Sequence, residues 1–366
     1  TILKWAVYND GFGHDFVNKS LNLARSLILW NMQKLEQEIS ERNISMAAST
    51  LTNGDGAASD DNESSTIKEL VEFISKLSKK YYKLCNKLFV NDNAQIKEEA
   101  FFELSDLLIL FNPQVAQTHK EYKQLVMDCP ANDINILTNY VVENAFADDA
   151  HDRNTDKPER IEKLHKRRCI LSSFSKLICY NCVPIKYAAD IFRGYIKYSS
   201  SYGDIIKHLL ATCRDISRVV TAKTIVLALQ REFNDLNFDA VANNSSSKTA
   251  NGAADATMRV DRSAPEFTGI RELARRFCLS FGPDASVRSR EAIVSIHQEA
   301  LKFVSTTASA SAQVAPLNLP FLEIVAEFTS RLTPPDKRLI LAELDKCFAK
   351  RANKLEENCW QPYYTY

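Results

Sequence analysis

The chain has 366 residues, and its 46 Lys and Arg residues balance 46 Asp and Glu residues, so the formal net charge is zero. Hydrophobic residues make up 45% and charged residues 25%, which is ordinary for a globular protein with a packed core. Only 9 residues are Gly, well below the usual share of about 7%. This shortage argues against both a glycine-rich nucleotide-binding fold and a hairpin-rich all-β fold.

Apolar residues recur at helical spacing along most of the chain. Residues 67–90, for example, carry one apolar stripe of a 3.6-residue helix, with Lys and Glu between its members. Similar stripes predict helices at about 15–43, 94–112, 132–146, 159–182, 185–199, 201–217, 219–237, 264–281, 285–305, 318–332 and 335–357. Pro113, Pro130 and Pro184 stand between stripes, where a missing N–H is tolerated. No segment alternates like a strand, so we predict an all-α fold.

The number and spacing of these helices indicate repeated pairs. Paired lengths near 40 residues favour a HEAT-like helical-hairpin solenoid, an α-α superhelix. No residue signature repeats, so a compact helical bundle stays open as the alternative. The chain begins TILKWAVYND, without Met and inside an amphipathic pattern, so we expect a fragment of a longer array.

Two segments interrupt the helical pattern with small polar residues. Such segments bury too little apolar surface to offset the entropy of ordering, so we expect disordered insertions. The expected organisation is a helical repeat at 1–44, a disordered insertion at 45–65, helical repeats at 66–147, an acidic loop at 148–158, basic helical repeats at 159–238, a second disordered insertion at 239–262 and C-terminal helical repeats at 263–360.

The cysteines and histidines do not indicate a metal or catalytic centre. The nine Cys residues are scattered and odd in number, which predicts buried thiols in a reducing compartment. Cys179 and Cys182 have C-x-x-C spacing, but the nearby His165 and Cys169 lie on the same predicted helix, and one straight helix cannot surround a zinc ion. The alternative of core thiols is favoured. We expect no metal and no cofactor.

Motifs of catalysis and of membrane insertion are missing from the sequence. The chain has no phosphate-binding loop, no nucleophile elbow and no clustered acid–base set, so we expect a protein that is not an enzyme. A helical enzyme remains the open alternative. No signal peptide and no apolar run near 18 residues supports secretion or a membrane span.

Positive charge is concentrated in the middle of the chain. Residues 161–231 contain thirteen Lys and Arg against four Asp and Glu. Lys163, Lys166, Arg167 and Arg168 cluster within two helical turns, where cations can contact a nucleic-acid backbone without reading sequence. The alternative is a solvated helix face that only keeps the protein in solution.

Two charged residues interrupt apolar runs. Asp106 lies within AFFELSDLLILF (100–111), and Lys176 lies within LSSFSKLI (171–178). Because a buried unpaired charge is costly, each must reach solvent, an opposite charge or a ligand. Such charges can anchor a bound peptide, although both can also extend to solvent from the edge of the stripe.

Six segments resemble the C-terminal half of the HEAT-repeat region of the cohesin subunit SA family (stromalin, or STAG-type, proteins). They are 160–181, 188–217, 222–236, 269–283, 290–304 and 319–333, and they occur in the order of the family. The resemblance covers most of 94–360 and is weaker over the first ninety residues. It implies a hook-shaped, non-enzymatic solenoid in the nucleus, on chromatin.

The resemblance also implies partners. In the family, the solenoid binds the central region of the kleisin subunit, is joined through it to the SMC heterodimer, and contributes to sequence-independent DNA binding. The positions that match the family's kleisin contacts are Asp106, in A-F-x-x-L-x-D-L-L, and Lys176, in F-S-K-L-I. The alternative function is a different peptide-binding helical-repeat adaptor, such as a transport receptor, without DNA binding.

Overall fold

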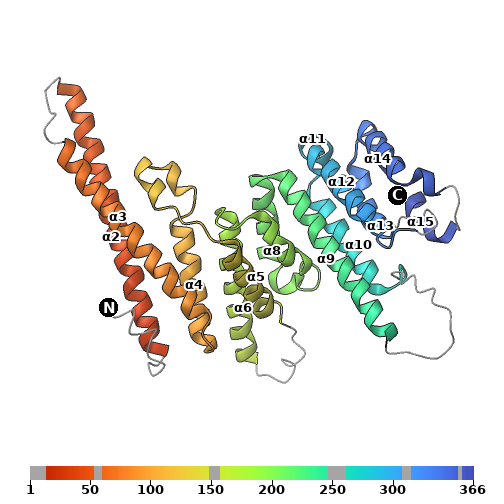
Figure 1. The fold of residues 1–366 in the computed structure, drawn as a ribbon, viewed down its shortest axis with the longest axis horizontal. Helices are drawn as coiled ribbons and strands as arrows, with labels where there is room; N and C mark the ends of the chain where they lie inside the picture. The colour runs from red at the N-terminus through yellow and green to blue at the C-terminus, as the bar shows by residue number, and fades with distance from the viewer. Residues whose placement is uncertain (1–13, 53–59, 148–156, 246–260, 307–314, 353–356) are drawn as a thin grey trace. The chain divides into compact units, whose positions relative to one another are not determined.

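A computed structural model describes residues 14–52, 60–147, 157–245, 261–306, 315–352 and 357–366 (Figure 1). All regular elements among these residues are helices, so the prediction of an all-α helical-repeat fold is confirmed. The α-helices are α2 (His14–Thr52), α3 (Asp60–Phe89), α4 (Ala94–Leu110), α5 (Ala131–Ala145), α6 (Lys157–Cys179), α7 (Ala189–Arg193), α8 (Ser199–Ile216), α9 (Arg218–Ser245), α10 (Pro265–Ser280), α11 (Ala285–Arg288), α12 (Arg290–Thr306), α13 (Phe321–Val325), α14 (Pro334–Ala352) and α15 (Glu357–Thr365). The 3₁₀-helices are η1 (Val115–Gln117), η2 (Lys120–Gln124), η4 (Ile185–Ala188) and η5 (Ala326–Arg331). None of these described helices has the length and apolar character needed to cross a membrane.

Residue contacts divide the chain into two compact units. Unit 1 ends at Val183, and unit 2 begins at Pro184. This boundary falls inside the segment 159–238 that the sequence pattern groups as one block of basic helices.

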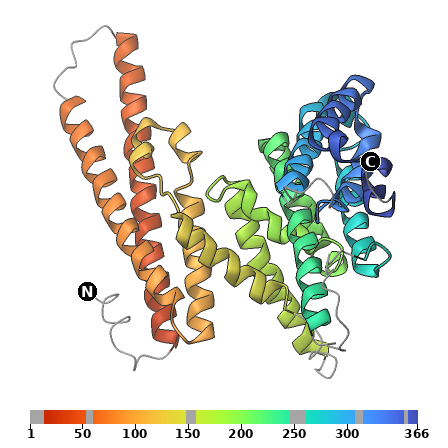
Figure 2. The same cartoon turned by 45° about the vertical axis from the view of Figure 1, so that its right-hand side comes forward.

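Unit 1 begins with a long antiparallel hairpin of α2 and α3 (Figures 1 and 2). Their pairing follows from a seven-residue repeat, because this spacing keeps one apolar seam turned toward the partner helix. On α3 the repeat consists of Ile67, Ile74, Tyr81 and Leu88, each at most 4% exposed. The facing seam of α2 is formed by the buried residues Val17, Leu21, Ala24, Ile28, Leu35 and Ile39.

An aromatic cluster joins this hairpin to the next helices. The fully buried ring of Phe101, on α4, lies with its centre 6.4 Å from that of Phe89 on α3 and 5.1 Å from that of Tyr140 on α5. The rings of Phe89 and Tyr140 are also 5.1 Å apart. Edge and tilted contacts of this kind add to the burial of apolar surface. They hold three helices of unit 1 in one core.

Unit 2 is built around α9 and α12, which lie side by side (Figures 1 and 2). The rings of Phe233 on α9, Phe303 on α12 and Phe321 on α13 lie with centres 4.9–6.2 Å apart. Lys223 Nζ, near the start of α9, lies 3.6 Å from Oε1 of Glu299, which precedes Phe303 on α12. The order of these contacts shows that α9 and α12 run in the same direction.

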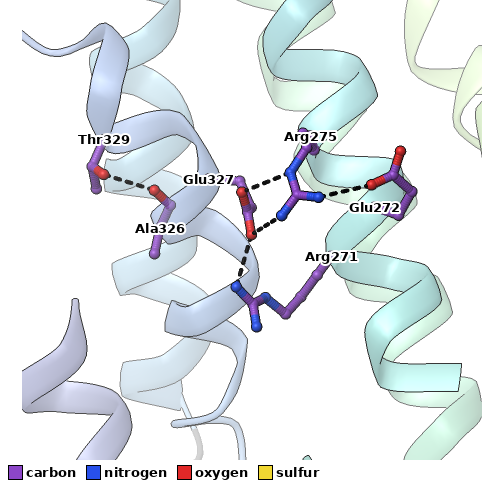
Figure 3. A network of polar contacts seen from close by, with 6 residues as sticks. All are labelled: Arg271, Glu272, Arg275, Ala326, Glu327 and Thr329. Carbon is purple, nitrogen blue, oxygen red and sulfur yellow. Dashed lines mark hydrogen bonds and ion pairs between the residues drawn. The ribbon is translucent and has the colours of Figure 1, made fainter. Parts of the chain in front are cut away.

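A polar network joins α10 to η5 in unit 2 (Figure 3). Glu327 accepts a hydrogen bond of 2.9 Å from Arg271 and two of 3.3 Å from Arg275. Arg275 also pairs with Glu272 at 3.0 Å. Each of these charged groups is paired with another group of unit 2, so the network holds α10 against η5 and has a structural role.

The structure differs from the sequence-based expectation at several helix ends. Residues 45–52 continue α2, and α3 begins at Asp60, within the insertion expected at 45–65; residues 53–59 lie outside the described residues. Ala and Met are strong helix formers, and the 45–52 segment contains both, so the helix continues. Likewise α9 extends to Ser245, while 246–260 of the second expected insertion and 148–156 of the expected acidic loop lie outside the described residues.

Two predicted helices are shorter or tighter than expected. The segment 185–199 forms η4 and then only the five residues of α7, and Gly194 caps that short helix. The segment 318–332 divides into α13 and the 3₁₀-helix η5. Short 3₁₀ segments are common at helix ends, and apolar periodicity alone does not distinguish them from α-helix.

Candidate partner-binding site

Asp106 projects from α4 into solvent. The helix begins at a capped end, where the Asn93 side chain accepts hydrogen bonds from the backbone N–H groups of Gln95 and Ile96. Between residues 96 and 112, Asp106 is the only exposed residue, and its side chain is 60% exposed. The charge that interrupts the apolar run therefore lies on the outer face of a helix that is otherwise covered.

Asp106 lies beside an ion pair between Arg25 and Glu103. Arg25 of α2 lies 3.6 Å from Asp106 Oδ2 and 3.0 Å from Glu103 Oε1. Glu103 is only 3% exposed and accepts a 2.8 Å hydrogen bond from the Tyr81 hydroxyl. Burial raises the pKa of Glu103, while Tyr81 and Arg25 act in the opposite direction. Arg25 is thus held between a buried and an exposed carboxylate.

These polar groups lie in a largely apolar surface groove of about 460 Å³. The groove contains Arg25, Tyr81, Glu103, Asp106 and the apolar residues Ile28, Leu29, Leu107, Ile109 and Leu110. Leu29 is exposed, so the groove offers apolar surface beside a carboxylate. This combination suits a peptide that places a basic residue next to apolar ones.

Lys176 is to the second half of α6 what Asp106 is to α4, a single exposed charge in a stretch that is otherwise largely covered. It is the only exposed residue between 167 and 179, and it forms no ion pair with a described residue. The helix ends just beyond it, where Asn181 adopts a positive φ of 63° and the N–H groups of Cys182 and Val183 donate to the Leu177 carbonyl. The Cys182 thiol then donates to the Leu108 carbonyl at 3.2 Å, which ties the end of α6 to the end of α4.

Two contacts place Asp106 and Lys176 on the same face of the α4–α6 pair. Lys166, near the middle of α6, pairs with Glu98 near the start of α4. Cys182, just beyond the end of α6, meets Leu108 near the end of α4, so α4 and α6 run parallel. Successive residues of an α-helix are rotated by about 100° around the helix axis. The direction of Asp106 is therefore rotated by roughly 80° from that of Glu98, and the direction of Lys176 is rotated by roughly 80° in the opposite sense from that of Lys166. Because Glu98 and Lys166 point toward each other, these opposite turns lead to one side. The rise of about 1.5 Å per residue puts both charges at about the same height, ~12 and ~15 Å beyond the Glu98–Lys166 pair.

The predicted basic cluster lies on the first half of α6. Lys163 pairs with Glu159 at 3.2 Å, and Lys166 pairs with Glu98 of α4. Arg167 and Arg168 are half-buried and also have interaction partners. An incoming phosphate therefore has to compete with carboxylates for at least two of these four cations.

The cysteines on α6 and just after it are free thiols. Burial raises the pKa of Cys182 to about 12. Cys169 Sγ lies 3.6 Å from His165 Nε2 on the same helix. No group of His, Cys, Asp and Glu in the described ranges has an arrangement suited to a metal ion.

Reasoning from sequence did not single out Arg25 or Glu103. Glu103 was visible as a second acid in the apolar run, one helical turn before Asp106. Nothing in the sequence shows that Arg25, about eighty residues earlier, reaches both carboxylates, because this contact depends on how α2 packs against α4.

Helices that pack in parallel and antiparallel arrangements against their neighbours define the class of α-helical repeat proteins. Residues 218–366 match the family described as the STAG protein C-terminal domain. The chain is 30% identical over its whole length to cohesin subunit SA-1 of Xenopus laevis, and 33% identical over 83% of its length to cohesin subunit SA-3 of Mus musculus. It is also 30% identical over 76% of its length to cohesin subunit scc-3 of Caenorhabditis elegans.

The matched region is about a quarter of the length of these curated relatives, covering 26%, 23% and 23% of them. The chain belongs to the cohesin subunit SA family, also called stromalin or STAG-type proteins.

Proposed function

We propose that this chain is part of a non-enzymatic cohesin scaffold subunit in the nucleus, on chromatin. It binds the central region of the kleisin subunit, is joined to the SMC heterodimer through the kleisin, and assists the association of the complex with DNA for sister-chromatid cohesion. The observation that carries the proposal is the placement of Asp106 and Lys176 on one face of α4 and α6, each the only exposed residue in its stretch.

This placement supports kleisin binding by simple electrostatics. One carboxylate and one ammonium group at similar height can pair with a basic and an acidic residue of the same extended segment. The groove beside Asp106 supplies apolar contact area. Opposite charges at two fixed points also favour one orientation of the segment over the reverse.

DNA association is proposed for Lys163, Lys166, Arg167 and Arg168 on α6. Because Glu159 and Glu98 already pair with two of these cations, we expect weak, sequence-independent contact with the DNA backbone. Salt screens the attraction between these cations and the DNA backbone, so binding is expected to be strongest at low ionic strength.

Reversing Lys163, Lys166 and Arg167 to Glu should flatten the salt dependence of duplex DNA binding. Each lost phosphate contact lowers the slope of log K against log salt by about 0.9, so we expect a decrease of about 1–3. Fluorescence anisotropy with a labelled duplex of arbitrary sequence, measured from 50 to 200 mM salt, provides the slope.

The matched control reverses the exposed Lys79, Lys80 and Lys83 of α3 to Glu, which changes the net charge of unit 1 by the same amount. An unaltered slope in the α6 variant, or an equal decrease in the α3 variant, counts against the cluster as a DNA contact.

The second candidate function, a peptide-binding adaptor outside cohesin, predicts a different set of partners. A pull-down with the purified SMC–kleisin core separates the two. Capture of this core by the chain supports the cohesin proposal, whereas failure to capture it favours the adaptor.

A further inference from the structure

A cavity of about 410 Å³ in unit 2 lies where two helix junctions meet. The α8–α9 junction contributes Arg214, Ser217 and Arg218, and the α11–α12 junction contributes Arg288 and Ser289. Arg218 donates a hydrogen bond to the backbone carbonyl of Arg288, which joins the two junctions. The cavity is therefore bounded by helix ends from distant parts of the sequence.

Three guanidinium groups share this cavity without a carboxylate partner. Arg214, Arg218 and Arg288 form no ion pair with a described residue. Other arginines of unit 2 do have such partners, as Arg262 has in Glu323 and Arg290 in Asp336. Burial lowers the pKa of Arg214, and the nearby Arg218 lowers it further against the opposite effect of Asp215. The cavity therefore holds three cations against two carboxylates, and these arginines keep N–H groups that can bind an incoming anion.

Ser289 supplies a hydroxyl to the same cavity. The residue is only 6% exposed and lines the cavity, and no described residue forms a hydrogen bond with its hydroxyl. The hydroxyl can therefore donate to an acceptor atom that enters the cavity. In addition, α9 and α12 both begin here and run in the same direction, so their positive ends add to the field of the arginines.

We propose that this cavity binds the phosphate of a phosphorylated serine or threonine in a partner peptide. Arginine forks match the geometry of phosphate oxygens and hold them by paired, charge-assisted hydrogen bonds, and Ser289 donates one more. The carboxylates of Asp215 and Glu291 also line the cavity. They favour a basic residue beside the phosphate and oppose a second phosphate.

The same two carboxylates decide between a phosphopeptide and nucleic acid. Duplex DNA brings one negative charge about every 1.7 Å along its axis and is best met by cations spread along a surface. Here the cations converge on one concavity that contains two acids. The site lies in unit 2 and does not depend on the kleisin or DNA contacts proposed for unit 1.

A direct test uses the whole chain and a fluorescent peptide of the order Lys, Ala, phosphoserine, Ala, Ala, measured by anisotropy. We expect the phosphorylated peptide to bind saturably. The same peptide with an unmodified serine should bind at least about tenfold more weakly. Arg214→Met, Arg288→Met and Ser289→Asp should each weaken it by at least about tenfold, the last by placing a negative charge in the cavity. Arg338→Met, at an exposed arginine of α14, is the matched control and should bind as the parent chain does.

Thermal unfolding of each variant shows whether its fold is kept, and Ser289→Asp and Arg218→Met serve if Arg214→Met does not fold. Equal binding of the phosphorylated and unmodified peptides overturns the proposal. So does binding that is indifferent to all the cavity variants. If a short DNA duplex binds through these arginines while the phosphopeptide does not, the cavity is a DNA-backbone contact and the phosphopeptide assignment is wrong.

Discussion

Asp106→Lys should weaken the binding of a kleisin central-region peptide about thirtyfold or more. Removing one partner of a desolvated charge pair typically costs about 2–5 kcal/mol, and reversal adds repulsion from the basic residue that Asp106 is proposed to bind. The new lysine would also face Arg25, which lies 3.6 Å from the present carboxylate. Isothermal titration calorimetry with the purified chain and peptide measures the loss.

Lys176→Glu is the companion variant, and we expect a similar loss of affinity. Asp92→Lys and Lys80→Glu serve as controls, because both residues are exposed in unit 1 and neither lines the groove beside Asp106. Near-parent affinity is expected for them. Unchanged affinity in both Asp106→Lys and Lys176→Glu would remove these two residues from the binding site.

Unit 2 should lose stability in mild acid through His297. This side chain of α12 is 0% exposed, and its Nδ1 hydrogen-bonds to the Tyr366 hydroxyl. Burial lowers the pKa of His297 from 6.5 to about 3. The folded state keeps the imidazole neutral while the unfolded chain protonates it, so the unfolded state gains stability as the pH falls below 6.5. The expected loss is about 2 kcal/mol by pH 5.

Urea unfolding at pH 7 and pH 5 tests this linkage. The parent chain should lose more free energy of unfolding between the two pH values than His297→Gln does, by about 2 kcal/mol. His208→Gln, at an exposed histidine of α8, should retain the full pH dependence. If the two variants respond alike, His297 is not the group responsible.

The fold class could be predicted because apolar periodicity reports directly on helix formation. The seven-residue spacing of Ile67, Ile74 and Tyr81 is visible in the sequence and is the seam that α3 buries against α2. Helix ends were predicted less well, since propensity and packing compete there. The extension of α2 to Thr52 through a polar segment is one example, and the 3₁₀ form of η5 is another.

Part of the candidate site could be predicted for the same physical reason. A charge inside an apolar run must leave the core, and both Asp106 and Lys176 are exposed. Their common face depends on the parallel packing of α4 and α6, which no local pattern shows. The contact of Arg25 with Glu103, and the gathering of Arg214 and Arg288 in one cavity, likewise join residues far apart in the sequence.

The proposed kleisin-binding surface is the face of α4 and α6 that bears Asp106 and Lys176. Site-specific photocrosslinking tests it most directly, with a photoreactive amino acid placed in turn at positions 106, 176 and 80 and the crosslinked peptides identified by mass spectrometry. We expect positions 106 and 176 to crosslink to one short stretch of the kleisin central region, and position 80 on α3 to give no such crosslink. Crosslinks from position 80 alone, or none from either 106 or 176 when the complex is formed, would contradict it.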